Sequence, residues 1–368
     1  MRSIRPGEKS AEMSRPMRIL FAPDWRAGVP YQTLLADALV RRGAKVRFLQ
    51  GYKRVLPLSR LLKDQDCDIL HLHWPEAYYP RRGNALDWFR TARFPFDLDR
   101  ATQNAVLVTT AHNLYAHNRG ADGLVGRNVR YANRKSRIVF AHSAGAKQKL
   151  AGAFGLDPSL VRVVPHGDLS VAMAPPVSQA EARHQLGLSD DKLALMFGTV
   201  EPYKGVEDVI AWWHKMQPPI KLAVVGRPVT DQYATQISRA IGDTSKILSR
   251  LEFLTDDALS LWLSAADLVI FNYREILTSG AASLARSYGI PLLLPHRLDT
   301  VDLDEPTPYV RRFTDLAIDF GSELDTALSM PPDFASAASW RQACNWDRIA
   351  DLTIDGYRSA LELKKCAA

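Results

Sequence analysis

The chain has 368 residues, of which 46% are hydrophobic and 24% are charged. This composition is typical of a globular protein, and the length allows two domains of ordinary size. No apolar run reaches the roughly 18 residues that a membrane-spanning helix needs. The polar opening, residues 1–16, lacks the apolar core of a signal peptide and is predicted to be a disordered extension. The three cysteines show no metal-binding spacing and fit a reducing compartment.

The net charge of +7 is unevenly distributed along the chain. Residues 1–170 contain 28 Lys and Arg against 14 Asp and Glu, a net charge of +14, whereas residues 171–368 contain 19 against 26, a net charge of −7. This asymmetry indicates that the first half meets an anionic partner. Nucleic acid and an anionic membrane surface are both candidates. The simpler alternative is that the basic residues only make the surface soluble.

Apolar runs and helix-like segments alternate from Met17 onward. In the first half, strands are predicted at residues 17–23, 45–50, 67–74, 104–113 and 136–143, with helices at 29–43 and 144–154. Paired prolines and polar residues predict a linker at 173–190. In the second half, strands are predicted at 193–200, 221–228, 248–255, 267–273 and 290–295, with helices at 205–216, 230–242, 256–266, 278–289 and 346–365. Such alternation favours parallel sheets covered by helices on both faces.

The predicted fold class is therefore α/β, with two Rossmann-like doubly wound domains facing across a cleft. The first domain spans residues 17–172, and the second spans residues 191–345. Proteins of this architecture bind ligands at the carboxyl ends of their strands, between the two halves.

Polar residues gather at these predicted strand ends in the first half. They are Asp24, Trp25, Gly28, His71, His73, Trp74, Glu76, His112, Asn113, His142, Ser143, His166, Gly167 and Asp168. Five of the nine histidines are among them, which raises the possibility of a metal site. We expect the alternation of side chains to point His71 and His73 to opposite faces, and no HExxH or CxxC spacing accompanies them. No metal site is therefore predicted, and structural histidines are the alternative.

The second half carries features suited to a diphosphate. Lys204 precedes a predicted helix, where a point charge and free backbone N–H groups can hold phosphate. Arg227 ends a neighbouring strand. The segment "REILTSG" at 274–280 adds a third strand end that leads into a helix. Three such features at one sheet edge would suit a diphosphate with a sugar or a nucleoside on either side. The segment around Lys204 is not a Walker loop, because GxxxxGK[ST] is absent.

From Met17 to Tyr357 the chain resembles bacterial glycosyltransferases of the GT-B fold, and it is similar to glycosyltransferase family four. The resemblance rests on an ordered series of segments: "RAGVPYQTLLADALVRRGAKVRFL", "DILHLHWPE", "TAHNLYAH", "AHSAGAK", "VPHGD", "FGTVEPYKGVEDVI", "VVGRP" and "AADLVIFNYREILTSGAASLARSYGIPLLLP". It implies that the first domain binds the acceptor and the second the nucleotide-sugar. It also implies that a final helix, 346–368, crosses back to the first domain.

The resemblance implies a role for each matching residue. His112 would contact the transferred sugar, Lys204 would neutralise the diphosphate, and Glu275 would be the first acid of a Glu-x7-Glu motif. The catalytic candidates are His112, Asp24, Glu76 and Glu275. The donor-binding candidates are Lys204, Arg227, Arg274, Thr278, Ser279, Gly280 and His166, and the acceptor-binding candidates are Gly28, His73, Trp74 and Asn113. No metal is expected to be required, because no Asp-x-Asp metal motif is apparent in the segments that carry the resemblance.

The chain departs from the family pattern at two places. The second acid of the motif falls at Ser283 or Leu284, and neither is acidic. Glu201 stands where many relatives have an arginine, so Arg227 or Arg274 would supply the positive charge. The donor therefore stays open between GDP-sugars and UDP-sugars. Retention and inversion also stay open; inversion would need a base such as Asp24, Glu76 or His112 beside the acceptor hydroxyl.

The predicted activity is transfer of a hexosyl or uronosyl residue to a glycan acceptor, linked to a polyprenyl diphosphate, in exopolysaccharide or other surface polysaccharide synthesis. The segments 52–63 and 81–94 mix apolar and basic residues, as a membrane interface requires; ordinary core-facing helices are the alternative. The expected location is cytoplasmic, peripheral on the inner face of the plasma membrane.

A dehydrogenase or epimerase would need a glycine-rich fingerprint after the first strand, and "APDWRAGVP" has one glycine. A non-catalytic nucleotide-sugar-binding protein is the other alternative, and no nucleic-acid partner is expected.

Overall fold

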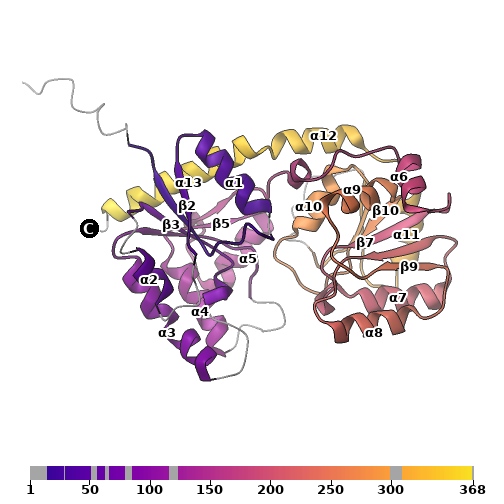
Figure 1. The fold of residues 1–368 in the computed structure, drawn as a ribbon, viewed down its shortest axis with the longest axis horizontal. Helices are drawn as coiled ribbons and strands as arrows, with labels where there is room; N and C mark the ends of the chain where they lie inside the picture. Colours follow the sequence, from indigo (N-terminus) through magenta and orange to yellow (C-terminus); the bar gives the residue numbers. More distant parts are fainter. Residues whose placement is uncertain are drawn as a thin grey trace, which may run out of the picture.

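The computed structural model describes residues 15–28, 30–50, 56–62, 66–78, 85–115, 123–298 and 309–366. The predicted extension thus lies outside the described residues up to position 14. Two α/β domains stand side by side, and the last helix runs from the second domain back along the first (Figure 1).

The first domain is built on a six-stranded parallel sheet of order β2-β1-β3-β4-β5-β6. Its strands are β1 (Arg18–Ala22), β2 (Lys45–Phe48), β3 (Ile69–His73), β4 (Val106–Thr110), β5 (Ile138–Ala141) and β6 (Val161–Val163). One face is covered by α2 (Pro57–Leu62), α3 (Ala85–Ala101), α4 (Gly123–Lys135) and α5 (Ala144–Phe154). The other face is covered by α1 (Pro30–Arg41) and α13 (Trp346–Cys366). Short 3-10 turns lie at Pro75–Tyr78, Pro158–Leu160 and Leu169–Ala172.

The second domain repeats this plan with a parallel sheet of order β12-β11-β10-β7-β8-β9. Its strands are β7 (Leu193–Phe197), β8 (Lys221–Val225), β9 (Ile247–Arg250), β10 (Leu268–Ile270), β11 (Leu292–Pro295) and β12 (Val310–Phe313). Its helices are α6 (Gln179–Leu186), α7 (Val206–Met216), α8 (Asp231–Ile241), α9 (Asp256–Ala265), α10 (Gly280–Ser287), α11 (Phe320–Ser329) and α12 (Phe334–Ala343), with a 3-10 turn at Pro202–Lys204. The inner strands of both sheets are continuous apolar runs buried on both faces, which explains the parallel pairing, and the predicted fold class is confirmed.

The stretch predicted as a linker, 173–190, contains a helix of its own. Helix α6 begins after the cap Ser178 and ends at Gly187, which adopts the left-handed conformation. Arg183 on this helix forms an ion pair of 2.6 Å with Asp267, the residue just before β10. Helix α6 is therefore part of the second domain's outer layer, a contact that its polar sequence did not predict.

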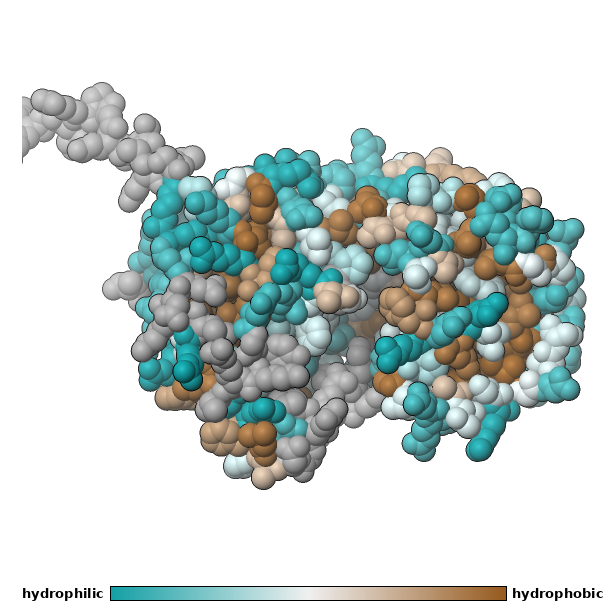
Figure 2. Space-filling model, in the orientation of Figure 1, coloured by the Kyte–Doolittle hydropathy of each residue, from teal (hydrophilic) through white to brown (hydrophobic). Residues whose placement is uncertain are grey.

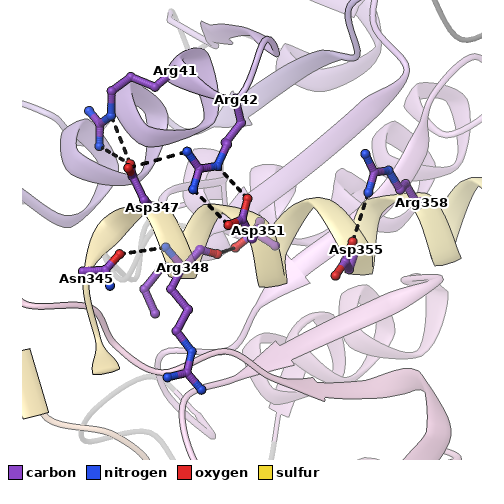
Figure 3. A network of polar contacts seen from close by, with 10 residues as sticks. Arg41, Arg42, Asn345, Asp347, Arg348, Asp351, Asp355 and Arg358 are labelled. Carbon is purple, nitrogen blue, oxygen red and sulfur yellow. Dashed lines mark hydrogen bonds and ion pairs between the residues drawn. The ribbon is translucent and has the colours of Figure 1, made fainter. Parts of the chain in front are cut away.

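Helix α13 returns to the first domain and lies along α1. Arg41 and Arg42 form ion pairs with Asp347 and Asp351 (Figure 3). These pairs are exposed, and exposed pairs stabilise a fold by only about 0–1 kcal/mol each. Burial of the apolar face of α13 contributes more to the stability of the fold. Its buried members are Trp346, Ile349, Ala350, Tyr357 and Ala360.

Candidate active site

The histidines at the ends of β3, β4, β5 and β6 come together on the α1 and α13 face of the first sheet. His71 and His73 lie on the same face, with ring centroids 4.0 Å apart. The prediction that they point to opposite faces is wrong, because side chains two positions apart on a strand share a face. His71 contacts the Tyr357 hydroxyl at 2.6 Å and the Thr110 hydroxyl at 2.7 Å, so its role is structural.

His73, His112, His142 and His166 form what we call the histidine cluster. The Val164 carbonyl can only accept, so Nδ1 of His142 donates to it at 2.9 Å. Nε2 of neutral His142 then accepts from Nδ1 of His112 at 3.2 Å, and Nε2 of His112 accepts from Nδ1 of His73 at 3.3 Å. Both ring nitrogens of His112 are thus engaged. A sugar hydroxyl would have to replace one of these histidine partners.

Burial keeps the histidine cluster neutral at physiological pH. Loss of hydration lowers the pKa of His142 to about 4 and that of His73 to about 3. The same cause, together with neighbouring imidazoles, places the pKa values of His112 and His166 well below 6.5. Among the described residues, Nε2 of His73 and Nδ1 of His166 are buried without a hydrogen-bond partner.

Two aromatic side chains hold the histidine cluster in place. Trp74 has a positive φ of 47° and stacks on His112, with ring centroids 3.7 Å apart. A left-handed backbone is uncommon for so bulky a residue and marks a specially positioned side chain. Tyr31, at the start of α1, meets His112 and His166 edge-on at 5.1 and 5.2 Å. The sequence reasoning missed Tyr31, although it directly follows the helix-starting Pro30.

The histidine cluster also touches the second domain at the N-terminus of α10. A β-carbon on Gly280 would lie 3.2 Å from Cε1 and 3.3 Å from Nε2 of His166. Leu277, just before α10, is buried in the hydrophobic cluster of the first domain. The predicted donor residues His166 and Gly280 therefore meet directly, at the boundary between the domains.

The N-terminus of α10 is capped from within. The Ser279 hydroxyl accepts a hydrogen bond from the backbone N–H of Ala282 at 3.1 Å, and Tyr273 also hydrogen-bonds to Ser279. Thr278 is half-buried beside this cap. Ser279 thus uses its side chain for the helix. Of the two positions that replace the missing acid, Ser283 is half-buried and Leu284 faces the core.

Lys204 ends the 3-10 turn that follows β7 and lies in a narrow pocket with Gly198, Thr199, Val206 and Tyr273. Its side chain is 7% exposed, and its ammonium lies 5.5 Å from the centroid of the Tyr273 ring. Burial lowers the pKa of Lys204 to about 8, and the nearby Glu201 opposes this shift. A cation with few water contacts binds a diphosphate more strongly than a solvated one.

Two glycines bring the ends of β7 and β8 close to this pocket. A β-carbon on Gly226 would lie 2.1 Å from the carbonyl oxygen of Gly198, so position 226 has no room for a larger residue. The Val200 N–H donates to the Arg227 carbonyl at 2.8 Å. The Arg227 side chain is exposed. The backbone of the "VVGRP" segment therefore lies near the Lys204 pocket, as predicted.

The arginines near the end of β10 are not arranged as predicted. Arg274, which was predicted to bind phosphate, instead forms an exposed ion pair of 3.0 Å with Asp208. The neighbouring Glu275 is exposed. Arg297, which the sequence reasoning missed, donates to the Asn272 side chain at 2.9 Å and to the Tyr273 carbonyl at 3.0 Å. No motif marked Arg297, because it follows a different strand, β11.

The predicted catalytic and acceptor residues of the first domain lie in three loops. Asp24 follows β1 and accepts two hydrogen bonds of 2.9 Å from Arg26, which hold the pKa of its carboxyl below the usual range. Gly28 is exposed in the same loop, with open space around its Cα. Glu76 is half-buried in the turn after β3, and Asn113 is half-buried after β4. Buried Gln32, a further omission of the sequence reasoning, accepts from the Trp25 N–H and donates to the Pro23 carbonyl.

One group of side chains in the described part of the chain has the geometry of metal ligands. His112, His142 and His166 each offer a ring nitrogen, and these atoms lie within 4.8 Å of one another. The sequence predicted no metal site, because no HExxH or CxxC spacing accompanies the histidines; the fold brings these three together from different strand ends.

The chain is similar to several known proteins. A family model described as Glycosyltransferase Family 4 matches residues 19–168. Two curated relatives from Xanthomonas campestris pv. campestris, each a GDP-mannose:glycolipid 4-beta-D-mannosyltransferase, are 28% identical over 90% of this chain and 88% of their own. The structure of Anabaena HepE with UDP-glucose has a TM-score of 0.70 at 17% identity, covering 93% of this chain and 100% of that one. Sucrose-phosphate synthase from Thermosynechococcus elongatus has a TM-score of 0.70 at 16% identity, covering 95% and 100%.

Proposed function

We propose that this chain, a glycosyltransferase of the GT-B fold similar to glycosyltransferase family 4, transfers mannose from GDP-mannose to a glycolipid. The observation that carries the proposal is the likeness to the two mannosyltransferases over nearly the whole of both chains. We further propose that the glycolipid is a polyprenyl-diphosphate-linked glycan and that the product enters exopolysaccharide or another surface polysaccharide.

The second domain would stabilise the leaving diphosphate electrostatically. Lys204 would supply the charge, and the free backbone N–H groups at the N-terminus of α10 would donate hydrogen bonds. A preorganised donor of this kind is typically worth about 2.7–4 kcal/mol in the transition state. We propose that no metal ion is needed at the diphosphate. Turnover that rises steeply with added Mg²⁺ or Mn²⁺ would contradict this.

An inverting reaction suits the relatives' β-linked product, because the mannose of GDP-mannose is α-linked. Inversion needs a base that removes the acceptor proton. Arg26 makes Asp24 a weak base, and both nitrogens of His112 are engaged; Glu76 lies half-buried in the turn directly after β3, three residues from His73 of the histidine cluster, and we propose it as the base. We expect Glu76→Gln to lower kcat by roughly a hundredfold or more, with Asp24→Asn, a matched change, costing less. The reverse order of the two effects would assign the base to Asp24.

The decisive experiment offers the purified chain GDP-mannose, UDP-glucose and UDP-glucuronate, with and without a glycolipid acceptor. We expect acceptor-dependent release of GDP and a β-mannosyl product, identified by NMR of the anomeric proton. Preference for a UDP-sugar would replace the donor assignment. Donor binding without turnover on any acceptor would favour the alternative of a non-catalytic nucleotide-sugar-binding protein.

Helix α3 of the first domain offers a membrane-docking face. Leu86, Trp88, Phe89 and Phe96 are exposed, Trp88 by 69%. Figure 2 shows apolar side chains at the lower end of the first domain, where Figure 1 places α3. The domain is basic, so we propose that this face docks on an anionic bilayer, peripherally and on the cytoplasmic side of the plasma membrane. The described helices include none that is long and apolar enough to cross a bilayer.

The segment 52–63 and part of the segment 81–94, both predicted to lie at a membrane interface, do not fit docking. In 52–63, Leu58 and Leu62 are buried in the core, and residues 52–55 and 63 lie outside the described residues. In 81–94, Phe94 is buried, and 81–84 lie outside the described residues. These buried side chains agree with the alternative that the two segments are ordinary core-facing helices.

A liposome assay tests the docking face. We expect the protein to sediment with anionic vesicles, and the double change Trp88→Ser and Phe89→Ser to abolish most of this binding. Phe253→Ser, which removes an exposed phenylalanine from the second domain, is the matched control and should leave binding intact. High salt should release the protein, since screening weakens surface electrostatics. Equal binding by the α3 double variant would exclude this face.

A further inference from the structure

We propose that His112, His142 and His166 bind one divalent transition-metal ion of the Zn²⁺ class. The three residues follow β4, β5 and β6, and their available ring nitrogens lie within 4.8 Å of one another. The observations behind this proposal do not depend on the proposed glycosyl transfer.

The spacing of the first two ligands already suits zinc. Zn–N bonds of about 2.0–2.1 Å in a tetrahedron place ligand nitrogens roughly 3.4 Å apart. Nδ1 of His112 and Nε2 of His142 are separated by 3.2 Å. The longer separations therefore involve His166. His166 as a residue is half-buried, although its Nδ1 is enclosed, and it would have to move inward to complete the tetrahedron.

The outer contacts of the triad match those of metal-bound histidines, whose second ring nitrogen usually donates to an acceptor. Nδ1 of His142 donates to the Val164 carbonyl in any case. When Nδ1 of His112 binds the ion, its proton resides on Nε2 and is donated to Nδ1 of His73, which then carries its own proton on Nε2. Only the tautomers of two rings change, so no net proton is gained or lost.

An unpartnered atom also indicates a missing ligand. Nδ1 of His166 is buried and has no hydrogen-bond partner among the described residues. A buried nitrogen without a partner is costly, and coordination to an ion would satisfy it. Because all three rings are neutral at pH 7, their lone pairs are available.

The donor set defines the class of ion. Three imidazoles suit Zn²⁺, Co²⁺, Ni²⁺ and Cu²⁺ and disfavour Mg²⁺, which prefers oxygen ligands. A fourth position remains for solvent. The ion would join three strand ends of the first domain, and His166 would carry its effect to α10, which it touches at Gly280.

The test loads full-length protein, freed of any histidine tag, with Co²⁺ and Zn²⁺. We expect one ion per chain by mass spectrometry of the metal, and a tetrahedral Co²⁺ spectrum without thiolate charge-transfer bands. His166→Asn and His142→Gln should lose the ion. His184→Asn, which changes an exposed histidine away from the cluster, should keep it. His166 is partly exposed, so H166N serves if H142Q does not fold.

Two results would overturn the proposal. One is the absence of stoichiometric binding to the folded protein. The other is binding that survives H166N or shows thiolate bands, which would place the ion elsewhere. A thermal-shift assay gives a second readout, since an ion that binds the folded state raises Tm; we expect a rise for the unchanged protein and for H184N, and none for H166N. Glycosyl transfer is not measured, so failure of the proposed function would not alter these outcomes.

Discussion

Lys204 shows how one buried charge can set both affinity and pH dependence. Its ammonium is nearly enclosed, and burial lowers its pKa to about 8. In the free protein the charge is lost as the pH rises through this value. In the proposed site a donor diphosphate would bind the charged form, so donor affinity should be highest below about pH 8 and should fall above it.

We expect Lys204→Ala to lower kcat/KM by about a hundredfold or more, because one preorganised donor is worth roughly 2.7–4 kcal/mol. For the unchanged protein, the Kd of GDP-mannose should rise up to about tenfold per pH unit above pH 8. Lys204→Arg is the matched variant, since a guanidinium stays charged over this range. Isothermal titration at several pH values checks both. A flat pH profile for the unchanged protein, or near-normal turnover by K204A, would remove Lys204 from the donor site.

Helix α13 illustrates how an element can be positioned by a residue that is locally unfavourable. Gly356 lies within this long helix, where glycine is normally about 0.5–1 kcal/mol less stable than alanine. A β-carbon here would lie 2.4 Å from Cε1 of Phe140, a buried ring on β5. Glycine therefore permits the close approach of α13 to the first sheet.

We expect Gly356→Ala to lower the free energy of unfolding by about 1–3 kcal/mol, since a clash with a buried ring outweighs helix propensity. Gly152→Ala in α5 is the matched control, because that position has open space. It should be stabilising by about 0.5–1 kcal/mol. Urea denaturation measures both changes. If G356A were stabilising to the same extent as G152A, α13 would not pack as closely as described.

At the scale of the whole molecule, the histidine cluster makes the fold sensitive to acid. The cluster and His71 stay neutral in the folded chain, with the pKa of His142 at about 4 and that of His73 at about 3. In the unfolded chain a histidine titrates near pH 6.5. The unfolded chain thus binds more protons below pH 6.5, so stability is fully present above this value and is lost as the pH falls below it.

We expect the free energy of unfolding of metal-free protein to fall steeply between about pH 6.5 and 5, by up to roughly 1.4 kcal/mol per pH unit for each buried histidine. His142→Gln should reduce this slope by the contribution of about one proton, roughly 1.4 kcal/mol per pH unit. His184→Asn should not change the slope. Urea denaturation across this range checks the prediction. Constant stability from pH 7 to 5 would mean that these imidazoles are accessible to protons.

The sequence alone determined the architecture and predicted one half of the candidate site. Apolar runs of strand length, separated by capped helices, can bury themselves only in parallel sheets with two covered faces, so both domains could be predicted. The segments around Lys204 and Gly280 were recognisable because their residues are neighbours along the chain.

Only the tertiary structure decided which distant side chains meet. It joined His112, His142 and His166, paired Arg274 with Asp208, and buried Leu277 in the first domain. The physical reason is that pKa, tautomer and partner depend on burial and on distances of a few Å. Residues tens of positions apart acquire these properties only when strand order and the returning helix bring them together.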